Sequence, residues 1–278
     1  MTSQAAAGLR IAGAVAGCSA LLLLSPLAPS QAGVPALSPA SEGEGEPRWS
    51  YSGDTGPQAW GELDPDWALC ADGTMQSPVD IGGASPRPLS NLDIQYAKSP
   101  TTVVDTGHTI EGVPDHFIKP SFLTIGNTQY RLKQFHFHAP SEHQVNGRSY
   151  PLEFHFVHAD KSDQIAVIGV FVEVGAPAGR AWRPFLASLT RHVNEGDDRQ
   201  IRMFDWPALL PDDQQTIRYS GSLTTPGCSE GVRWNLFTAT ITMSQAQINR
   251  FTREYDGNRR PLQPLNDRRV SLDSTPGR

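Results

Sequence analysis

The sequence is short of cysteine, of long hydrophobic runs and of stretches dominated by basic residues. Its most apolar run, residues 11–24, is too short and too rich in Gly and Ala to make a good membrane span. With a net charge of -6 and no stripe of Lys and Arg, the chain is not expected to bind nucleic acid. Neither a repeat period nor an internal low-complexity segment divides residues 47–270, so we expect a single domain there.

The N-terminal residues are expected to lie outside this domain. Arg10, the apolar run and the small residues up to Ala32 form the pattern of a secretory signal peptide, which implies export to the periplasm or the medium. Alternatively, the run ending at Cys18 is a lipoprotein cleavage box that would anchor the chain through that cysteine. The next segment is rich in Pro, Gly, Ser and Glu and has too few large apolar side chains to order itself. The expected division is therefore a signal peptide (1–32), a disordered linker (33–46), the domain (47–270) and a flexible C-terminal tail (271–278).

Two of the 3 cysteines, Cys70 and Cys228, remain once the signal peptide is removed. They are either two unrelated buried thiols or one disulfide that closes a very long loop, since export would place them in an oxidising compartment. In the chain-entropy model, a bridge of this span contributes about 4–5 kcal/mol to stability.

The dominant local pattern is that of β-strands. Short runs rich in β-branched and aromatic residues are separated by Gly, Pro, Asn or Asp. These runs lie at residues 101–112, 116–126, 128–139, 150–160, 164–175, 215–223 and 232–242. Helices are predicted at 178–192 and 244–255, with Ser244 as the N-cap of the second. Strands in succession, without a regular alternation with helices, predict an α+β domain with a mostly antiparallel sheet and short peripheral helices.

Histidine is scarce, but five of the 8 histidines lie between His136 and His158. Because alternate residues of a strand share a face, His136 and His138 point to one side and the intervening phenylalanines to the other. If the strand at 150–160 is the neighbour, His155 meets the first two imidazoles. Three neutral nitrogens on rigid strands, with a vacant fourth position, are typical of a catalytic zinc site.

Further side chains near these histidines are candidates for supporting roles. A metal-bound imidazole usually donates its other N–H to an oxygen acceptor, and Gln134 and Glu153 each lie two positions before a candidate ligand. His143 and His158 are interpreted as structural histidines of the core. His116 and His192 have no supporting context, and no role is assigned to them.

The motifs resemble those of the α-class carbonic anhydrases. The central blocks are QFHFHAPSEH (134–143), LEFHFVHAD (152–160) and SLTTPGCSEGVRW (222–234). Weaker blocks follow the family order at 48–53, 75–81, 106–110, 165–171 and 258–268. Together they cover nearly all of the expected domain, and the chain is identified as a member of the bacterial exported type. The resemblance implies a large, twisted, mostly antiparallel central sheet with the metal at the bottom of a cone.

The resemblance also implies a function. Zn²⁺ held by His136, His138 and His155 would supply a hydroxide that attacks CO2 reversibly to give bicarbonate and a proton. Thr224 corresponds to a gatekeeping threonine whose hydroxyl accepts a hydrogen bond from this hydroxide and donates one to Glu142.

Other positions acquire roles through the same resemblance. The apolar wall of the substrate pocket would consist of Val157, Val167, Leu223 and Trp234, with Thr225 beside the substrate. His108 corresponds to a proton-shuttle histidine, and Tyr51 to the tyrosine that organises the water chain. Cys70 and Cys228 match the disulfide of exported members. Inhibition by sulfonamides and anions is expected, and a homodimer is possible because bacterial relatives are often dimers.

The chain departs from the family pattern at three positions. Ala139 stands where vertebrate members commonly carry Trp, Gly227 replaces a second proline after the threonines, and Glu111 replaces a frequent neutral amide. These changes leave the metal ligands intact, but the resemblance no longer predicts the geometry of the turn at Gly227 or the contacts made by Glu111.

Two other functions remain open from the sequence. His136, His138 and Glu142 also satisfy part of a cupin motif, in which His, His and Glu bind iron or manganese in a dioxygenase. However, Tyr130 and Ser149 stand where cupins require Gly. The second alternative is a catalytically silent binding module with the carbonic anhydrase fold.

Overall fold

The structure is a computed structural model that describes residues 48–115, 117–189 and 198–275. The expected signal peptide, with Cys18, the whole of the expected linker and Pro47 lie outside these ranges, as do His116 and His192. Within them no helix is long and apolar enough to cross a membrane.

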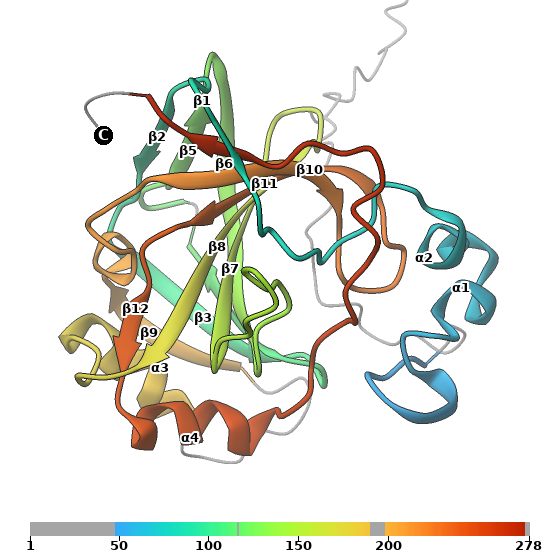
Figure 1. Ribbon diagram of the computed structural model, residues 1–278. Helices are drawn as coiled ribbons and strands as arrows, with labels where there is room; N and C mark the ends of the chain where they lie inside the picture. Colours follow the sequence, from blue (N-terminus) through green and yellow to red (C-terminus); the bar gives the residue numbers. More distant parts are fainter. Residues whose placement is uncertain (1–47, 116, 190–197, 276–278) are drawn as a thin grey trace, which may run out of the picture. The chain divides into compact units, whose positions relative to one another are not determined.

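The described residues form thirteen strands and several short helices (Figure 1). The strands are β1 (Ser85–Arg87), β2 (Leu92–Gln95), β3 (Ser99–Asp105), β4 (Ile110–Pro114), β5 (Phe122–Ile125), β6 (Thr128–His138), β7 (Leu152–Ala159), β8 (Ile165–Val174), β9 (Asp198–Phe204), β10 (Thr216–Ser222), β11 (Glu230–Phe237), β12 (Ile241–Met243) and β13 (Ser271–Asp273). The α-helices are α1 (Trp60–Leu63), α2 (Leu69–Asp72), α3 (Arg183–Ser188) and α4 (Gln245–Glu254). The 3-10 helices are η1 (Gly53–Thr55), η2 (Pro65–Trp67), η3 (Arg180–Trp182) and η4 (Trp206–Leu209).

All thirteen strands belong to one sheet, in the order β1-β13-β10-β11-β8-β7-β6-β4-β3-β9, with β12 beside β8 and β5 joining β2 to β6. Within the described ranges, the parallel pairs are β1–β13, β8–β11 and β8–β12, and the other pairs are antiparallel. The predicted α+β class, with a large, mostly antiparallel sheet and short peripheral helices, is therefore confirmed.

One face of β6 and β7 builds the main hydrophobic core. Phe135 and Phe137 on β6 and Phe154 and Phe156 on β7 are fully buried. They pack together with aromatic side chains of the helices and of the outer strand, namely Trp182, Phe185, Phe204, Trp206 and Phe251. Burying a phenylalanine side chain contributes about 1.5–3 kcal/mol, so this layer fixes which face of β6 points inward.

A β-bulge in β6 determines where the histidines point. Leu132 pairs with His158 and Gln134 pairs with Val157, so Lys133 is an extra residue on β6. Strict alternation would put Leu132 and Phe135 on opposite faces, yet both lie in the same core. The bulge therefore restores the inward direction for the phenylalanines and turns Gln134 and the following histidines to the other face.

The predicted C-terminal boundary is wrong for residues 271–273. Instead of a flexible tail, Ser271–Asp273 form β13, which pairs in parallel with β1 and antiparallel with β10. Asp273 is buried and accepts a hydrogen bond of 2.6 Å from Arg218. A three-residue strand with two polar residues has no periodicity, so the sequence does not indicate it.

One of the two predicted helices is found as predicted, and the other is shorter and divided in two. Helix α4 begins after Ser244, which caps it in a reciprocal capping box with Gln247, as the sequence predicted. The single helix expected at 178–192 is instead the short η3 followed by α3, which ends at Ser188; its last three expected residues lie outside the described ranges.

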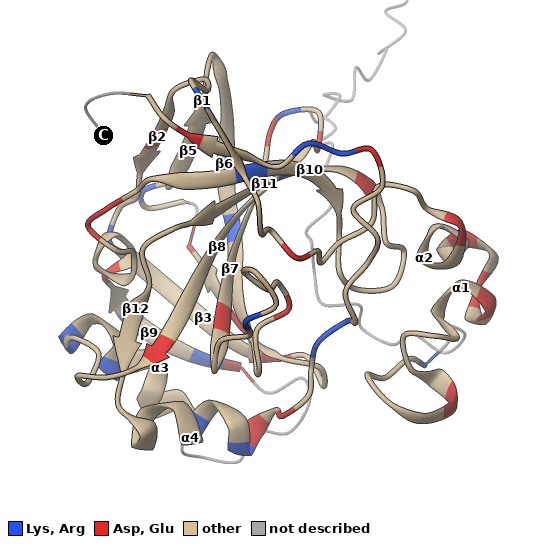
Figure 2. Cartoon of the chain, viewed as in Figure 1, with Lys and Arg blue, Asp and Glu red and all other residues tan. Residues whose placement is uncertain are grey.

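Charged residues of both signs are interspersed over the described chain (Figure 2). The segment that carries α1 and α2, residues 49–86, contains acidic residues but no Lys or Arg. This part of the surface is therefore negatively charged.

A disulfide joins Cys70 on α2 to Cys228, which lies between β10 and β11, across a sequence separation of 158. Both cysteines are buried beside Trp60 of α1. Of the two alternatives left open by the sequence, the disulfide is therefore confirmed and the pair of free thiols is wrong.

We expect the double substitution Cys70→Ser/Cys228→Ser to lower the free energy of unfolding by about 2–5 kcal/mol. The loop closed by the bridge is very long, so its loss releases much conformational entropy in the unfolded chain. Urea unfolding of the oxidised protein, the reduced protein and the variant would measure the effect. Equal unfolding free energies for the oxidised protein and the variant would contradict it.

Candidate metal centre

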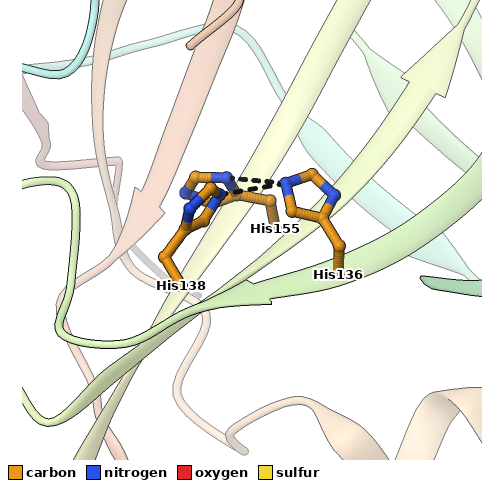
Figure 3. Close-up of side chains that lie close together, drawn as sticks. All are labelled: His136, His138 and His155. Atoms are coloured by element: carbon orange, nitrogen blue, oxygen red, sulfur yellow. Dashed lines mark hydrogen bonds between the residues drawn. The ribbon is translucent and has the colours of Figure 1, made fainter. Parts of the chain in front are cut away.

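Three imidazole rings from β6 and β7 converge (Figure 3). They lie on the face of the two strands opposite the phenylalanine layer. His136 pairs directly with His155 across the two strands, and His138 follows two positions later on the same face. The Nε2 atoms of His136 and His138 are 3.1 Å apart, and His155 Nδ1 is 3.3 Å from His136 Nε2. Nitrogen ligands at a tetrahedral zinc with bonds of about 2.0–2.1 Å lie about 3.3 Å apart, so the spacing fits this ion.

The electrostatics of the His136 and His138 rings also fit a cation. Burial holds the pKa of His136 well below its ordinary value, and the neighbouring His138 and His155 lower it further. Burial likewise lowers the pKa of His138. His136 and His138 therefore remain neutral and direct nitrogen lone pairs at each other, an arrangement that a metal ion would relieve.

Each ring has an oxygen acceptor behind its second nitrogen. His136 Nδ1 donates to Gln134 Oε1 at 2.8 Å, and His155 Nε2 donates to Glu153 Oε1 at 2.8 Å, at the positions that the sequence suggested. His138 Nδ1 donates to the backbone oxygen of Asn258 at 2.6 Å. These bonds fix the tautomer of every ring, so that the remaining nitrogen is free to bind a metal.

Glu153 is tied into a buried chain of hydrogen bonds. Its Oε1 also accepts from His143 Nδ1 at 2.8 Å, and its Oε2 accepts from the His143 backbone N–H at 2.8 Å. His143 Nε2 in turn accepts from the Tyr219 hydroxyl at 2.6 Å, which contacts Ser77 Oγ at 2.7 Å. Burial alone would raise the pKa of Glu153, but His143 and His155 hold it well below its ordinary value. His143 is thus a core histidine, as predicted.

Glu142 places a carboxylate oxygen close to the three rings. Its Oε1 accepts from the Arg260 backbone N–H at 2.8 Å. Its Oε2 is 3.4 Å from His138 Nε2 and 4.0 Å from His155 Nδ1, and it has no hydrogen-bond partner among the described residues. A buried oxygen without a partner costs about 1–3 kcal/mol, so this atom calls for a donor or a cation.

The loop between β10 and β11 carries Thr224 and Thr225. Thr224 is buried, but in this structure its hydroxyl does not donate to Glu142. The Cys228 N–H donates to the Thr225 oxygen at 3.0 Å, which closes the turn. Gly227 has a φ of +90°, whereas proline is held near about −65°, so this turn differs from one with a second proline.

The predicted apolar residues lie together on three neighbouring strands. Val157 pairs with Val167, and Val167 pairs with Trp234. All three are buried in one cluster, against which Leu223 packs. The Trp234 ring lies 4.8 Å from the ring of His155, centre to centre, so this cluster adjoins the imidazoles.

His108 and Tyr51 line a separate pocket of about 350 Å³. The His108 ring stacks on Trp49 at a centroid distance of 3.6 Å, and Tyr51 meets it edge-on at 6.4 Å. Burial raises the pKa of Tyr51 well above its ordinary value. The pocket also includes Asn258, whose side-chain amide donates to the His108 oxygen at 3.2 Å. Asn258 therefore connects this pocket to His138.

Glu111 on β4 is buried next to the metal-facing side chains. Its Oε1 accepts from Gln134 Nε2 at 3.0 Å, and its Oε2 has no partner among the described residues. Burial raises the pKa of Glu111 to about 8.

Several contributors were missed by sequence reasoning. Asn258 acts through a backbone oxygen, which no side-chain pattern reveals. Tyr219 and Arg260 lie far from the histidines in the sequence and lack a distinctive spacing. They reach the site because β10 and the segment after α4 pass over it.

The chain is similar to known proteins along most of its length. A model of the eukaryotic-type carbonic anhydrase family matches residues 55–274. The carbonic anhydrase of Neisseria gonorrhoeae is 39% identical over 239 residues, covering 84% of this chain and 91% of that protein. The solved complex of an α-carbonic anhydrase from Thermovibrio ammonificans with sulfanilamide is 41% identical, with a TM-score of 0.75, covering 82% of this chain and 100% of that one. A hyperthermostable carbonic anhydrase from a hydrothermal vent chimney is 39% identical, with a TM-score of 0.76 and coverage of 82% and 100%.

Unlike the three histidines of the candidate metal centre, His158 lies on the core side of β7 and has structural partners. Its Nδ1 donates to the Ala166 oxygen at 3.1 Å, and its Nε2 accepts from the Tyr96 hydroxyl at 2.7 Å. Burial lowers its pKa from 6.5 to about 3. The structural interpretation made from the sequence is confirmed.

We expect the titration of His158 to contribute to acid sensitivity. The unfolded chain takes up this proton more readily than the folded one, so stability falls as the pH drops from about 6.5 toward 3, by about 1.4 kcal/mol per pH unit. His158→Gln removes this contribution, so its stability deficit relative to the wild type should shrink between pH 7 and pH 4. Urea unfolding across this range measures it, and a constant deficit would contradict the expectation.

Proposed function

The chain belongs to the eukaryotic-type (α) carbonic anhydrase family, and on that premise we propose that it is a zinc enzyme with His136, His138 and His155 as ligands. The family's general reaction is the reversible hydration of CO2 to bicarbonate and a proton. The observation that carries the proposal is the convergence of three ring nitrogens: His136 Nε2 lies 3.1 Å from His138 Nε2 and 3.3 Å from His155 Nδ1, and each ring is held by an acceptor behind it. Family membership excludes the cupin dioxygenase alternative.

The donor set suits a catalytic zinc ion and leaves one coordination position for a small molecule. When bound, Zn²⁺ acidifies a coordinated water and so supplies a nucleophile near neutral pH. The protein's part is to fix the tautomer and the orientation of the three imidazoles, which Gln134, Glu153 and the Asn258 oxygen accomplish.

Glu142 and Thr224 would orient the nucleophile. The unpartnered Oε2 of Glu142 is the natural acceptor for the Thr224 hydroxyl, since pairing it removes the cost of a buried, unsatisfied oxygen. A threonine that donates to Glu142 can only accept from the nucleophile, which directs a nucleophile lone pair toward the substrate. The Thr224 backbone N–H can steady charge that develops on the product.

CO2 is apolar, and the cluster of Val157, Val167 and Trp234 beside His155 offers a matching wall. Leu223, in the loop after β10, packs against this cluster, and we assign Thr225 of the same loop to a position beside the substrate. Transfer of the product proton to buffer is assigned to His108, with Tyr51 ordering water between it and the metal centre. The pocket around His108 would let a buffer molecule approach this ring.

Export and inhibition follow from the same proposal. The disulfide is consistent with an oxidising compartment outside the cytoplasm, reached through a signal peptide at 1–32. Because the related Thermovibrio ammonificans enzyme was solved with sulfanilamide, we propose that primary sulfonamides, and small anions, inhibit this chain. The predicted homodimer and the lipoprotein alternative through Cys18 stay predictions.

We expect His138→Ala to reduce CO2 hydration by more than about 100-fold and to abolish stoichiometric zinc, because a ligand is lost rather than a supporting contact. Stopped-flow hydration assays and metal analysis measure both quantities, with Gln129→Ala, an exposed position on the same strand, as the control. Full activity without zinc, or resistance to a primary sulfonamide, would contradict the proposed function. A silent binding module would show zinc but no hydration.

We expect His108→Ala to lower kcat at least about tenfold in weak buffer while kcat/KM changes little, since the ring moves a proton after the chemical step. Added imidazole should restore kcat. A variant whose kcat in weak buffer equals that of the wild type would remove His108 from proton transfer.

A further inference from the structure

Glu111 is a buried acid at a position where the family resemblance leads one to expect a neutral amide. Gly112, the next residue, pairs with Phe135, and a Cβ on Gly112 would lie 2.3 Å from the Phe135 ring. Only glycine therefore allows β4 to approach β6 this closely. Since Gly112 faces the Phe135 side, Glu111 faces the side of Gln134 and His136.

Three side chains form a directed chain of hydrogen bonds on this face. Gln134 Nε2 donates to Glu111 Oε1 at 3.0 Å, and Gln134 Oε1 accepts from His136 Nδ1 at 2.8 Å. A glutamine amide can be turned by 180° without changing its shape, which exchanges its donor and acceptor ends. The turned amide would present N–H to His136 Nδ1 and so favour a proton on His136 Nε2, the nitrogen needed for the metal.

An acceptor at the far end of Gln134 opposes that rotation. The turned amide would direct its oxygen at the Glu111 oxygens, so that two acceptors would face each other in a buried place. Burial raises the pKa of Glu111 to about 8. Both forms offer an acceptor oxygen to Gln134 Nε2, but only the ionised form lacks a donor, so it is the ionised carboxylate that opposes the rotation; the O–H of the neutral form could pair with the turned amide.

We propose that Glu111 is a positioning residue for the zinc site: by accepting from Gln134 it fixes the amide orientation that keeps His136 Nε2 free to bind the metal. This inference rests on the proposed function, because it takes His136 to be a ligand. Glu111 touches neither the metal nor the substrate, and its effect passes through Gln134.

The test compares Glu111→Met, which keeps the length but removes both oxygens, with Glu111→Gln, which keeps one acceptor oxygen. The zinc dissociation constants of these variants, of Gln134→Ala and of the double variant Glu111→Met/Gln134→Ala are measured by competition with a chelator. Loss of an acceptor behind a ligand typically weakens metal binding about 10–100-fold, so we expect about tenfold or more for Gln134→Ala and about threefold to tenfold for Glu111→Met. Glu111→Gln should recover at least half of that loss.

The double variant separates positioning from simple charge. If Glu111 acts through Gln134, adding Glu111→Met to Gln134→Ala weakens zinc binding no further than about twofold. If Glu111→Met lowers zinc affinity equally with and without Gln134→Ala, the effect comes from the charge and the inference is overturned. Wild-type zinc affinity in Glu111→Met would also overturn it. So would a Glu111→Gln variant that binds zinc as weakly as Glu111→Met. Glu62→Met, the same exchange at an exposed site, serves as the control.

A second readout does not depend on zinc. Nitrogen-15 NMR of the metal-free protein reports the His136 tautomer, and we expect Glu111→Met to increase the population protonated at Nε2. An unchanged tautomer would overturn the inference even if affinity fell. Failure of the wild type to bind zinc would contradict the proposed function instead, and the tautomer measurement would still decide the role of Glu111.

Discussion

The register in which β6 pairs with β7 controls the positions of His136, His138 and His155. His136 lies opposite His155 because the phenylalanines on the other face of both strands are locked into the main core. A shift by one residue would turn the histidines into the aromatic core and the phenylalanines onto the polar face, at a cost of several buried aromatic side chains. The bulge at Lys133 makes this register compatible with the rest of β6: before the bulge the even-numbered residues face the core, and after it the odd-numbered ones do. The packing of the phenylalanines on one face of β6 and β7 thus positions the histidines on the other face.

The polar face can be buried because nearly every donor and acceptor on it is paired. Glu153 alone accepts hydrogen bonds from two rings and a backbone N–H, and Tyr219 extends this network to Ser77. Such satisfied networks hold side chains rigidly, and rigid ligands favour one metal geometry. Two carboxylate oxygens, Glu111 Oε2 and Glu142 Oε2, are the unpaired exceptions in the described part of the chain. Glu142 Oε2 lies next to the proposed metal centre, where a donor or a cation would meet it, whereas Glu111 lies behind Gln134.

The sequence was sufficient to predict the features that depend on the alternation of side chains along a strand. The shared face of His136 and His138, the approach of His155 and the acceptors Gln134 and Glu153 all follow from a period of two on neighbouring strands. It was insufficient where contacts join distant segments, as with the Asn258 oxygen, the Arg260 backbone and the strand β13. These depend on how the C-terminal segment crosses the sheet, which no local pattern specifies. The hydrogen bond expected between Thr224 and Glu142 came from the family resemblance alone, and the structure does not contain it.

The central claim is that three imidazoles hold one zinc ion and leave its fourth position to a small molecule. Anomalous diffraction at the zinc edge, from crystals of the zinc-loaded protein, tests it most directly. The account predicts a single strong peak about 2.0–2.1 Å from His136 Nε2, His138 Nε2 and His155 Nδ1, with a non-protein oxygen as the fourth ligand. A peak elsewhere, or a fourth bond made by a Glu142 oxygen, would contradict the account.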